Sequence, residues 1–397
     1  MVFVGGTAPG DLVEAAVRDR GRLLEGRLLR VVEAGPARVP TRCVHVDVCG
    51  GCQWQQVSIE AQREAKRSNL IEALVRIARV PRESLGSVGL VASPESFRYR
   101  RRARFMVDDA GRLGYAGSQG RGPVALRECH LLTQPIERLA LGLSSLLRES
   151  STRPHHVEIC AVGEEASVLL EYDSGSPEDL QADLVKLMFA ELPSLAGVVV
   201  TPRSPKDVEL GNPTLSDGKT YLRPDAFSQA NQAVNEKLVQ AVLGALEPKP
   251  SDRVLELFCG SGNFTLPLAR LAREVVAVER LGMSLALLKR AALEAGISNL
   301  RIRPGEAAEI VRALAQSDER VDLALLDPPR AGARDLLGDL VRLAPRRIAY
   351  VSCDPATLAR DVGVLLGQGY RLEEATVFDQ FPQTYHLEAL ALLGRSG

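Results

Sequence analysis

The sequence predicts an α/β protein. Its C-terminal part is expected to form a Rossmann-like, doubly wound domain of seven strands, and an α+β domain is expected before it. After Pro248-Lys-Pro250, apolar segments of strand length alternate with helical segments, which is typical of a mostly parallel sheet. Before that point, short strands separated by glycine turns are expected over residues 111–175. The doubly wound strands are expected at 253–258, 274–279, 300–303, 321–327, 347–352, 370–378 and 388–393, with further helices at 58–79, 179–192 and about 235–246.

Length and composition limit the possibilities. The chain has 397 residues, enough for two or three domains, and we expect them at 1–40, 41–230 and 231–397. The formal net charge is −1, so a nucleic-acid site must come from local clustering of charge. No apolar stretch reaches the roughly 18 residues of a membrane span, and no secretory signal opens the chain. Seven cysteines without such a signal indicate metal or catalytic roles. We expect a cytoplasmic monomer without membrane contact.

Residues 1–40 hold too little structure for an independent domain. The segments 2–6 and 21–32 can each supply a strand, and Pro9-Gly10-Asp11 between them is a turn signal. Two strands are too few for a stable sheet on their own. This segment is therefore expected to pack against the rest of the chain or to be part of a larger module.

Three cysteines close together, Cys43, Cys49 and Cys52, predict a metal centre. The two glycines between the second and third cysteine allow the backbone to turn so that the sulfurs converge. A four-thiolate site needs one more ligand. We favour Cys129, which lies in a polar setting, over Cys160, which lies in an alternating strand. An iron–sulfur cluster is preferred over zinc, although the residue types hardly separate the two.

The segment 97–105 is the basic exception to the neutral composition. If it forms a strand, its aromatic residues share one face and four arginines share the other, because side chains alternate. The four are Arg98, Arg100, Arg102 and Arg104. Such a face either contacts RNA phosphates or is a solvated edge, and we favour phosphate contact.

A strand, a glycine turn and a helix follow one another at 254–264, with Gly260 and Gly262 in the turn. Glycines let a backbone approach a nucleotide-like ligand closely. The dinucleotide fingerprint requires a further glycine where this chain has Thr265. Glu279 ends the next strand, where an acidic side chain can bind both ribose hydroxyls. Together these features predict an adenosine cofactor without a pyrophosphate, hence S-adenosylmethionine.

Three further residues lie at expected strand ends, and each has two interpretations. Cys353 follows the fifth strand just before Pro355, which can start a helix, so its thiol is a candidate nucleophile or a small buried side chain. Asp327 ends the fourth strand and either faces the ligand or caps a helix. Glu388 starts the last strand as an exposed charge or as a base aimed into the site. Arg330 speaks against amino-group methylation, for which an aromatic residue after Asp-Pro-Pro is usual.

Six motifs, in this order, resemble the RNA (uracil-5-)-methyltransferase family. They are Cys-x5-Cys-Gly-Gly-Cys-Gln-Trp, Phe-Ser-Gln-Ala-Asn, Leu-Phe-Cys-Gly-Ser-Gly-Asn-Phe, Asp-Pro-Pro-Arg-Ala-Gly, Val-Ser-Cys-Asp-Pro-Ala-Thr and His-Leu-Glu-Ala-Leu. The resemblance runs from about residue 36 to the end and implies an S-adenosyl-L-methionine-dependent methyltransferase domain behind a central RNA-binding domain. It assigns the nucleophile to Cys353 and the general base to Glu388. The implied cofactor contacts are Gln229, Phe258, Asn263, Glu279, Glu306 and Asp327.

The same resemblance implies a metal cofactor and a substrate class. Cys43, Cys49, Cys52 and Cys129 match the four thiolates of a 4Fe–4S cluster, which is similar to that of the family's ribosomal-RNA branch. The implied partner is therefore RNA. The expected substrate is 23S ribosomal RNA, and transfer RNA is the alternative. Many family members begin with a full TRAM barrel, and residues 2–32 resemble only its second half.

The resemblance also implies a covalent mechanism. A thiolate adds to carbon 6 of uracil, carbon 5 then attacks the sulfonium methyl, and a base removes the carbon 5 proton before the thiol leaves. Two other classes remain open. A 5-methylcytosine RNA methyltransferase would carry a second cysteine where this chain has Pro329-Arg330. A non-catalytic iron–sulfur RNA-binding protein would not need Cys353 and Glu388.

Overall fold

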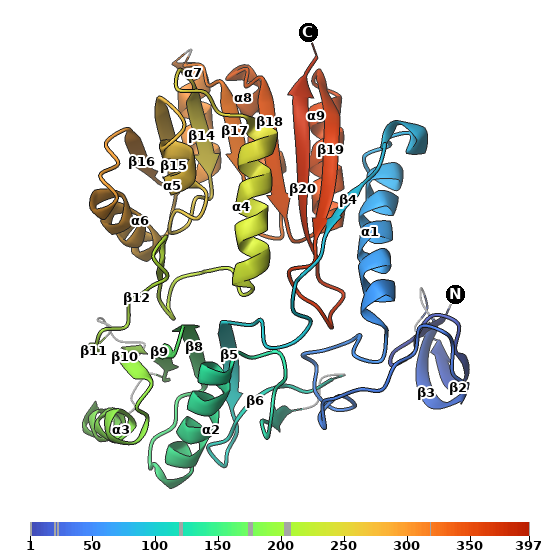
Figure 1. Cartoon of the computed structure of the whole chain (residues 1–397), viewed down its shortest axis with the longest axis vertical. Helices are drawn as coiled ribbons and strands as arrows, with labels where there is room; N and C mark the ends of the chain where they lie inside the picture. The colour runs from blue at the N-terminus through green and yellow to red at the C-terminus, as the bar shows by residue number, and fades with distance from the viewer. Residues whose placement is uncertain are drawn as a thin grey trace. The chain divides into compact units, whose positions relative to one another are not determined.

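The computed structural model describes residues 2–19, 21, 24–118, 122–173, 178–201, 208–317 and 319–396. The chain forms two compact units, which are coloured by residue number in Figure 1. Unit 1 comprises Met1–Ala65, Glu95–Pro213 and Phe381–Tyr385, and unit 2 comprises Lys66–Pro94, Thr214–Gln380 and His386–Gly397. These bounds differ from the expected borders at residues 40 and 230, because parts of 66–94 and 214–230 join the hydrophobic cores of unit 2.

Unit 2 is built on a mixed sheet, and the predicted doubly wound α/β fold is confirmed (Figure 1). Within the described residues the strand order is β16-β15-β14-β17-β18-β20-β19-β4. The strands are β4 (Gly89–Val91), β14 (Arg253–Leu257), β15 (Glu274–Glu279), β16 (Leu300–Pro304), β17 (Leu323–Leu326), β18 (Arg347–Ser352), β19 (Tyr370–Phe378) and β20 (Glu388–Arg395). The strands from β16 to β18 run parallel, whereas β20 is antiparallel to β18 and β19. The start of β20 therefore lies at the same edge as the carboxyl ends of β14, β15, β17 and β18.

The expectation of seven strands is wrong by one. β4 comes from a distant part of the sequence and pairs in parallel with β19 through three residues. A strand this short has no room for a periodic apolar pattern, so the sequence alone could not reveal it. A two-stranded ladder of β12 (Leu215–Ser216) and β13 (Tyr221–Leu222) also belongs to unit 2.

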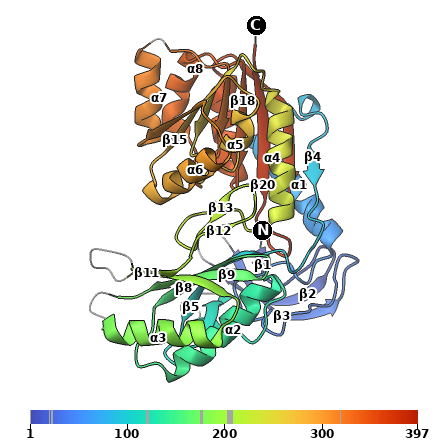
Figure 2. The ribbon, with the colours of Figure 1, turned by 60° about the vertical axis from the view of Figure 1, so that its left-hand side comes forward.

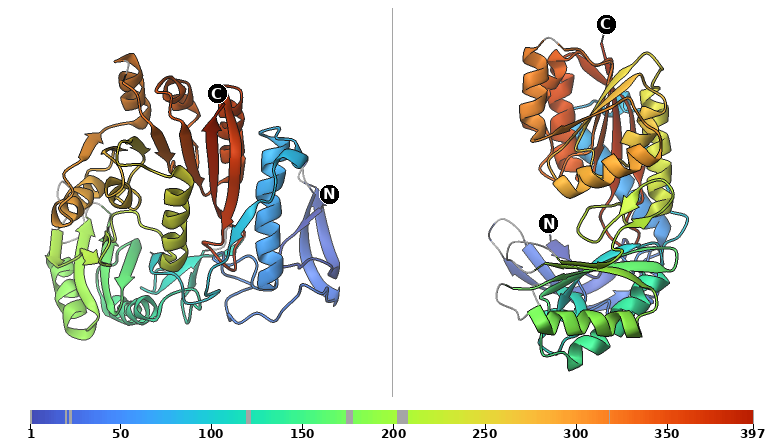
Figure 3. Two further views of the ribbon diagram at one scale, coloured as in Figure 1. Left: turned by 45° about the horizontal axis from the view of Figure 1, so that its top comes forward. Right: turned by 90° about the vertical axis from the view of Figure 1, so that its left-hand side faces the viewer.

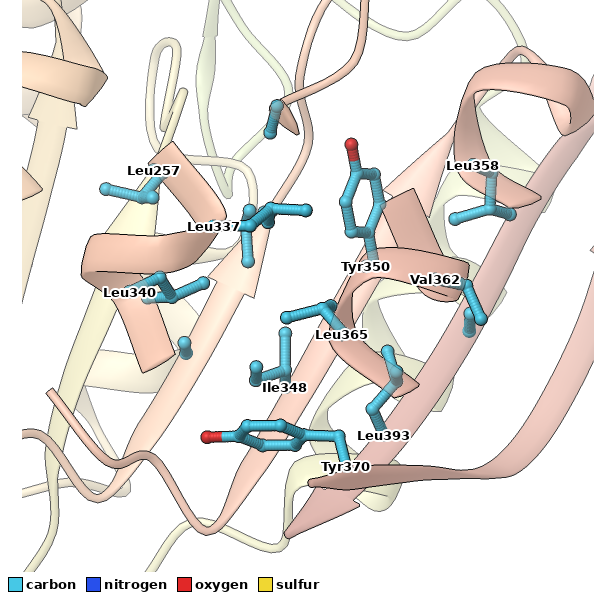
Figure 4. Close-up of a cluster of buried hydrophobic side chains, with 14 of the residues drawn as sticks. Leu257, Leu337, Leu340, Ile348, Tyr350, Leu358, Val362, Leu365, Tyr370 and Leu393 are labelled. Carbon is cyan, nitrogen blue, oxygen red and sulfur yellow. The ribbon is translucent and has the colours of Figure 1, made fainter. Parts of the chain in front are cut away.

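Helices cover both faces of the unit 2 sheet (Figure 3). One face packs against α4 (Gln232–Leu246) and α5 (Thr265–Ala269), and α6 (Gly282–Glu294) lies beside β15 and β16. The other face packs against α7 (Ala307–Gln316), α8 (Arg334–Arg342), α9 (Pro355–Leu366) and the unit 2 part of α1 (Ile59–Arg76). Figure 4 shows this second core around Ile348 and Tyr350 of β18, with Leu337 from α8 and Leu365 from α9. Burial of these apolar side chains fixes the strand ends that carry the site.

Unit 1 contains a second sheet, and the predicted α+β organisation is confirmed. In the described part of this unit the order is β11-β10-β9-β8-β5-β6-β7. The strands are β5 (Arg102–Val107), β6 (Leu113–Ala116), β7 (Pro123–Ala125), β8 (His156–Val162), β9 (Glu165–Glu171), β10 (Leu195–Thr201) and β11 (Val208–Gly211). One face packs against α2 (Gln134–Glu149) and α3 (Glu178–Glu191) (Figure 2).

Helix α2 lies inside residues 111–175, where only short strands were expected. Its buried residues Ile136, Leu139, Leu143 and Leu147 recur every three or four positions, which is the helical period. Proline at the start of α2 is compatible with the first turn of a helix. The signal for this helix was therefore present in the sequence.

The basic segment 97–105 does not form one arginine face, and this prediction is wrong. β5 begins at Arg102, and Arg98 has φ +56°, which breaks the alternation of a strand. Arg100 lines a cavity in unit 1. The other three arginines have acidic partners within unit 1, in the pairs Arg98–Glu137, Arg102–Glu158 and Arg104–Glu171. Most of this positive charge is thus neutralised inside the unit.

The N-terminal segment forms a three-stranded sheet rather than two strands. Its described strands are β1 (Val2–Val4), β2 (Leu12–Asp19) and β3 (Leu24–Glu33), in the order β1-β3-β2. β2 is mostly exposed and lacks a regular apolar alternation, which explains why it was not expected. Among the described residues, no helix is both long enough and apolar enough to cross a membrane.

Candidate active site

Cys353 and Glu388 lie across from each other at the carboxyl edge of the unit 2 sheet. The last pair between β18 and β20 joins Ser352 to Ala389. Cys353 follows Ser352, and Glu388 precedes Ala389, so both residues stand just beyond the last pair of this antiparallel ladder. The thiol and the carboxyl are therefore neighbours although 35 positions (388 − 353) separate them in the sequence.

The turn after β18 has the predicted form of strand, polar turn and helix. Asp354 caps α9, because its carboxylate accepts hydrogen bonds from two backbone N–H groups at 2.9 Å each. Pro355 occupies the first helical position, where its missing N–H costs no hydrogen bond. Cys353 is thereby held between two rigid elements and is half-buried.

The Cys353 thiol lies among charged groups of both signs. Burial and the carboxylate of Glu388 raise the pKa of Cys353 above its ordinary value, and Asp327 adds to this effect. Arg330 opposes them, because the positive charge of its guanidinium lowers the pKa of Cys353. Arg330 is exposed and follows Asp327 closely in the chain. The guanidinium is thus the group that favours the reactive thiolate.

Glu388 and Asp327 form a pair of interacting carboxyls. Glu388 is 3% exposed, so the interpretation of an exposed end charge is wrong. Burial raises the pKa of Glu388 well above its ordinary value, and the charge of Asp327 raises it further. Burial also raises the pKa of Asp327 to about 7. A carboxyl with a raised pKa is a stronger base once ionised, which suits proton abstraction near neutral pH.

Asp327 does not cap a helix, since α8 begins only at Arg334 with Ala333 before it. Instead Asp327 follows β17 directly, and its backbone N–H lies 3.4 Å from the carbonyl oxygen of Leu257 in β14. This places Asp327 next to the glycine turn that follows β14.

The turn after β14 has an unusual backbone. Phe258 has φ +62°, a left-handed conformation that side chains rarely adopt, and Gly260 and Gly262 also have positive φ. Strained positions of this kind cluster at ligand sites. The carboxylate of Glu279 holds the turn by accepting the N–H of Gly260 at 3.1 Å, and it also accepts the N–H groups of the two residues after it. Phe258, the glycines and Glu279 therefore form one preorganised loop.

The remaining predicted cofactor residues differ in how they are placed. Gln229 is buried and accepts a hydrogen bond from Gln380 at 3.0 Å. Asn263 exchanges two hydrogen bonds with Asn235 of α4, at 2.8 and 2.9 Å. Glu306 is different, because its side chain is 60% exposed and lies 3.6 Å from the guanidinium of Arg280.

Glu256 is a further candidate site residue that the sequence did not lead us to expect. It lies on β14 just before the glycine turn and is 1% exposed. Burial raises the pKa of Glu256 to about 8, and the nearby charge of Asp327 contributes. An acidic residue inside an otherwise apolar strand was the signal that could have revealed it.

Four cysteines of unit 1 line one cavity. Cys43, Cys49, Cys52 and Cys129 surround it, together with Gln55 and Arg100. Backbone N–H groups donate to the sulfurs of Cys43 and Cys49, at 3.4 and 3.3 Å. Burial, with a contribution from the charges of the other three cysteines, raises the pKa of Cys52 to about 12. Cys160 does not line this cavity; its sulfur lies 3.2 Å from Ser167 Oγ in the sheet.

The sulfurs of this cavity are spread apart. No three of them lie within 4.8 Å of one another, whereas the donor atoms of His155, His156 and Glu171 elsewhere in the described chain do. Glu171, however, already has the Arg104 guanidinium at 2.7 Å. A single tetrahedral zinc with Zn–S near 2.3 Å would bring its sulfurs to about 3.8 Å. Four thiols around one cavity are a donor set that suits either a zinc ion or an iron–sulfur cluster.

The doubly wound sheet, its glycine turn and the acidic residue on the next strand define the fold of the α/β methyltransferases. Residues 218–396 match the family model described as tRNA (Uracil-5-)-methyltransferase. The chain is 39% identical to a 23S rRNA (uracil(1939)-C(5))-methyltransferase of Pseudomonas putida, over 98% of this chain and 88% of that protein. It is 36% identical to the enzyme of that name from Edwardsiella ictaluri, over 98% and 90%.

A solved structure shows the same fold. The tRNA (uracil-54, C5)-methyltransferase of Pyrococcus abyssi, in complex with S-adenosyl-L-homocysteine, matches with a TM-score of 0.74 and 23% identity, over 99% of this chain and 95% of that one. The chain belongs to the RNA (uracil-5-)-methyltransferase family. It is an enzyme that methylates carbon 5 of uracil in RNA.

Proposed function

We propose that the enzyme methylates one uridine of 23S ribosomal RNA, with S-adenosyl-L-methionine as the methyl donor and Cys353 as a covalent nucleophile. The observation that carries the proposal is the position of Cys353 and Glu388, both just beyond the last pair between β18 and β20 and close to Asp327. A non-catalytic RNA-binding protein would have no need of a thiol and a buried base on facing strand ends.

The loop after β14 is proposed to hold the cofactor. Phe258 and the glycines would lie against the nucleoside, and the Glu279 carboxylate would accept hydrogen bonds from the ribose hydroxyls. Gln229, Asn263 and Asp327 would complete the site, with Glu306 as its most exposed member. When bound, S-adenosyl-L-methionine supplies an electrophilic methyl group on a sulfonium.

Cys353 is proposed to activate the target uracil for methylation. Carbon 5 of uracil is a poor nucleophile, but addition of the Cys353 thiolate to carbon 6 converts the ring to an enolate whose carbon 5 can attack a methyl group. Arg330 favours the thiolate that this step requires. A base within an RNA helix is stacked, so the target nucleotide must be flipped out or lie in a loop.

Glu388 is proposed to complete the reaction. After methyl transfer, carbon 5 carries both the methyl group and a hydrogen. Glu388 takes this proton, the electrons of the C–H bond restore the double bond between carbons 5 and 6, and the Cys353 sulfur leaves as thiolate. Burial of Glu388 keeps water away from the proton transfer.

Ribosomal RNA is favoured over transfer RNA as the substrate. Relatives named as 23S rRNA methyltransferases are 35 to 39% identical over nearly the whole chain. The solved transfer-RNA enzyme shares the fold at 23% identity. Transfer RNA is therefore the second candidate.

The cysteine cavity is proposed to hold a 4Fe–4S cluster on Cys43, Cys49, Cys52 and Cys129. Four thiols around one cavity supply the donor set that such a cluster needs. Backbone N–H groups and the positive charge of Arg100 would stabilise the negative sulfurs. The cluster would hold together the loops that carry the four cysteines.

The function is tested by transfer of tritiated methyl groups to RNA. The purified enzyme is supplied with ribosomal and transfer RNA from a strain that lacks its gene, and the labelled nucleoside is identified. 5-Methyluridine in 23S RNA is the expected product. Label in 5-methylcytidine, or in transfer RNA alone, would contradict the proposal.

A further inference from the structure

The segment that follows Asp327 is held against helix α9. It makes a tight turn, in which the N–H of Gly332 donates to the carbonyl oxygen of Pro329 at 2.8 Å. Gly332 has φ +79°, and a Cβ added there would collide with the side chains of Arg360 and Asp361. The backbone of this turn therefore approaches α9 more closely than a residue with a side chain would allow.

Two adjacent side chains of α9 hold this turn by its backbone. Asp361 is fully buried, and its Oδ2 accepts the N–H of Ala333 at 2.7 Å. Arg360 donates through Nη2 to the carbonyl oxygen of Ala331 at 2.8 Å and through Nε to Asp361 Oδ1 at 2.8 Å. One carboxylate and one guanidinium thus fix both sides of Gly332.

A third residue holds Asp361 itself. Tyr350 of β18 is fully buried, and its hydroxyl donates to Asp361 Oδ2 at 2.6 Å. Figure 4 shows the Tyr350 ring beside the apolar cluster, with its oxygen pointing away from Leu365 and Ile348. β18 ends at the nucleophile, so the same strand carries both Tyr350 and the start of the turn that contains Cys353. The network therefore links the strand of the thiol to the loop of Arg330.

Arg330 is the residue just before the held stretch 331–333. Arg330 follows β17, and β17 pairs in parallel with β18, which ends just before Cys353, so the two segments leave neighbouring strand ends. The positive charge of Arg330 lowers the pKa of this thiol. The other charged groups facing Cys353 are Glu388 of β20 and Asp327 after β17, which both disfavour the thiolate. A long exposed arginine loses this effect if its backbone moves, because charge interactions fall with distance.

We propose that Asp361 is a positioning residue, which with Arg360 and Tyr350 fixes the backbone of 331–333 so that Arg330 stays beside the Cys353 sulfur. The inference rests on the proposed role of Cys353 as the nucleophile. Its test does not depend on turnover, because the ionisation of the thiol can be measured directly.

The measurement is the rate of Cys353 alkylation by iodoacetamide as a function of pH. Trypsin releases the peptide 348–360, in which Cys353 is the single cysteine, so mass spectrometry follows this thiol alone. Replacing Arg330 (Arg330→Met) should raise the pKa of the thiol by about one unit, the lower end of the effect of a nearby opposite charge. Asp361→Asn should also raise the pKa of the Cys353 thiol, and it should lower the alkylation rate at neutral pH by up to about tenfold.

The double variant Arg330→Met/Asp361→Asn separates positioning from an independent effect. If Asp361 acts through Arg330, the double variant has the same thiol pKa as Arg330→Met alone. Shifts that add in the double variant would overturn the proposal. An unchanged thiol pKa in Asp361→Asn, with lowered thermal stability, would also overturn it and leave Asp361 a structural residue.

Asp252→Asn is the matched control. Asp252 is also buried and accepts two hydrogen bonds from Arg346, at 2.9 and 2.7 Å, but it lies at the opposite end of β14. The Asp252→Asn variant should be less stable than the wild type, but the pKa of its Cys353 thiol should be unchanged. If Asp361→Asn does not fold, Tyr350→Phe removes one donor to the same carboxylate, and a thiol pKa equal to that of the wild type would then refute the inference. Methyl transfer by Cys353→Ala would refute the proposed function separately.

Discussion

Lys66 Nζ lies 2.7 Å from Asp379 Oδ1, and both side chains are fully buried. Lys66 belongs to α1, and Asp379 directly follows β19. The next residue, Gln380, donates to Gln229, which is one of the proposed cofactor residues. This ion pair therefore anchors the segment on which Gln229 depends, although 313 positions separate its partners in the sequence.

Lys66→Met should destabilise the protein strongly. The substitution removes the cation that lies 2.7 Å from the buried Asp379 carboxylate, and breaking a buried pair in this way typically costs about 3–5 kcal/mol. Urea unfolding measures the loss. The control is Lys66→Met/Asp379→Leu, which removes both charges and should recover much of the stability. If the double variant is less stable than Lys66→Met, the pair is not the source of the effect.

Glu256 should make the stability of unit 2 fall as pH rises. Burial raises its pKa from 4.5 to about 8, so between these values the native state keeps a proton that the unfolded state releases. The free energy of unfolding then decreases by up to about 1.4 kcal/mol per pH unit. Glu256→Gln cannot titrate and should show a shallower decrease when urea unfolding is followed from about pH 5 to 8.

The exposed Glu309 of α7 provides the matched control for Glu256. Glu309→Gln removes one carboxylate from the surface and should keep the pH dependence of the wild type. Equal slopes in the wild type and in Glu256→Gln would show that the buried carboxyl is not linked to folding.

The cysteine cavity predicts which thiols hold iron. Cys129→Ser should lose the cluster, because it removes one of the four sulfurs around the cavity. Cys160→Ser should keep it, because the Cys160 sulfur lies against Ser167 in the sheet. Iron and sulfide are measured per chain after anaerobic purification, with about four irons expected for the wild type. Stoichiometric zinc without iron would reject the cluster.

The doubly wound sheet was predictable because its strands and helices are local in sequence. The strands β14, β15, β17, β18 and β20 are mostly buried runs rich in apolar residues, and the segments expected for the sheet match the observed ones within a few residues. Cys353 and Asp327 follow such strands and Glu388 begins one, so the rule that ligands lie at the carboxyl edge placed them together.

What the sequence could not show were contacts between distant segments. The arginines of 97–105 looked like a free cationic face, but Arg102 and Arg104 pair with Glu158 and Glu171, which lie on neighbouring strands. The addition of β4 to the unit 2 sheet is equally non-local. Such pairings leave no period in the sequence, because they depend on the register of strands far apart in the chain.

Cys353→Ala and Glu388→Gln should fail at different steps. Cys353→Ala lacks the attacking sulfur, so it should neither methylate RNA nor form a covalent link to it. Glu388→Gln keeps the sulfur but removes the base, so addition and methyl transfer proceed and elimination stalls. The expected product is a covalent protein–RNA adduct that carries the transferred methyl group and survives a denaturing gel. The wild type should show little of it, because turnover clears the adduct.

Two controls make this comparison decisive. Both variants must bind S-adenosyl-L-methionine as the wild type does, since loss of folding would also abolish the reaction. Glu373→Gln serves as the matched glutamate variant, because Glu373 lies on the neighbouring strand β19, remote from the start of β20, and is paired with Arg371 at 3.0 Å. It should turn over normally and accumulate no adduct. Normal turnover by Glu388→Gln would show instead that water or another residue takes the proton, and that Glu388 serves the fold rather than the chemistry.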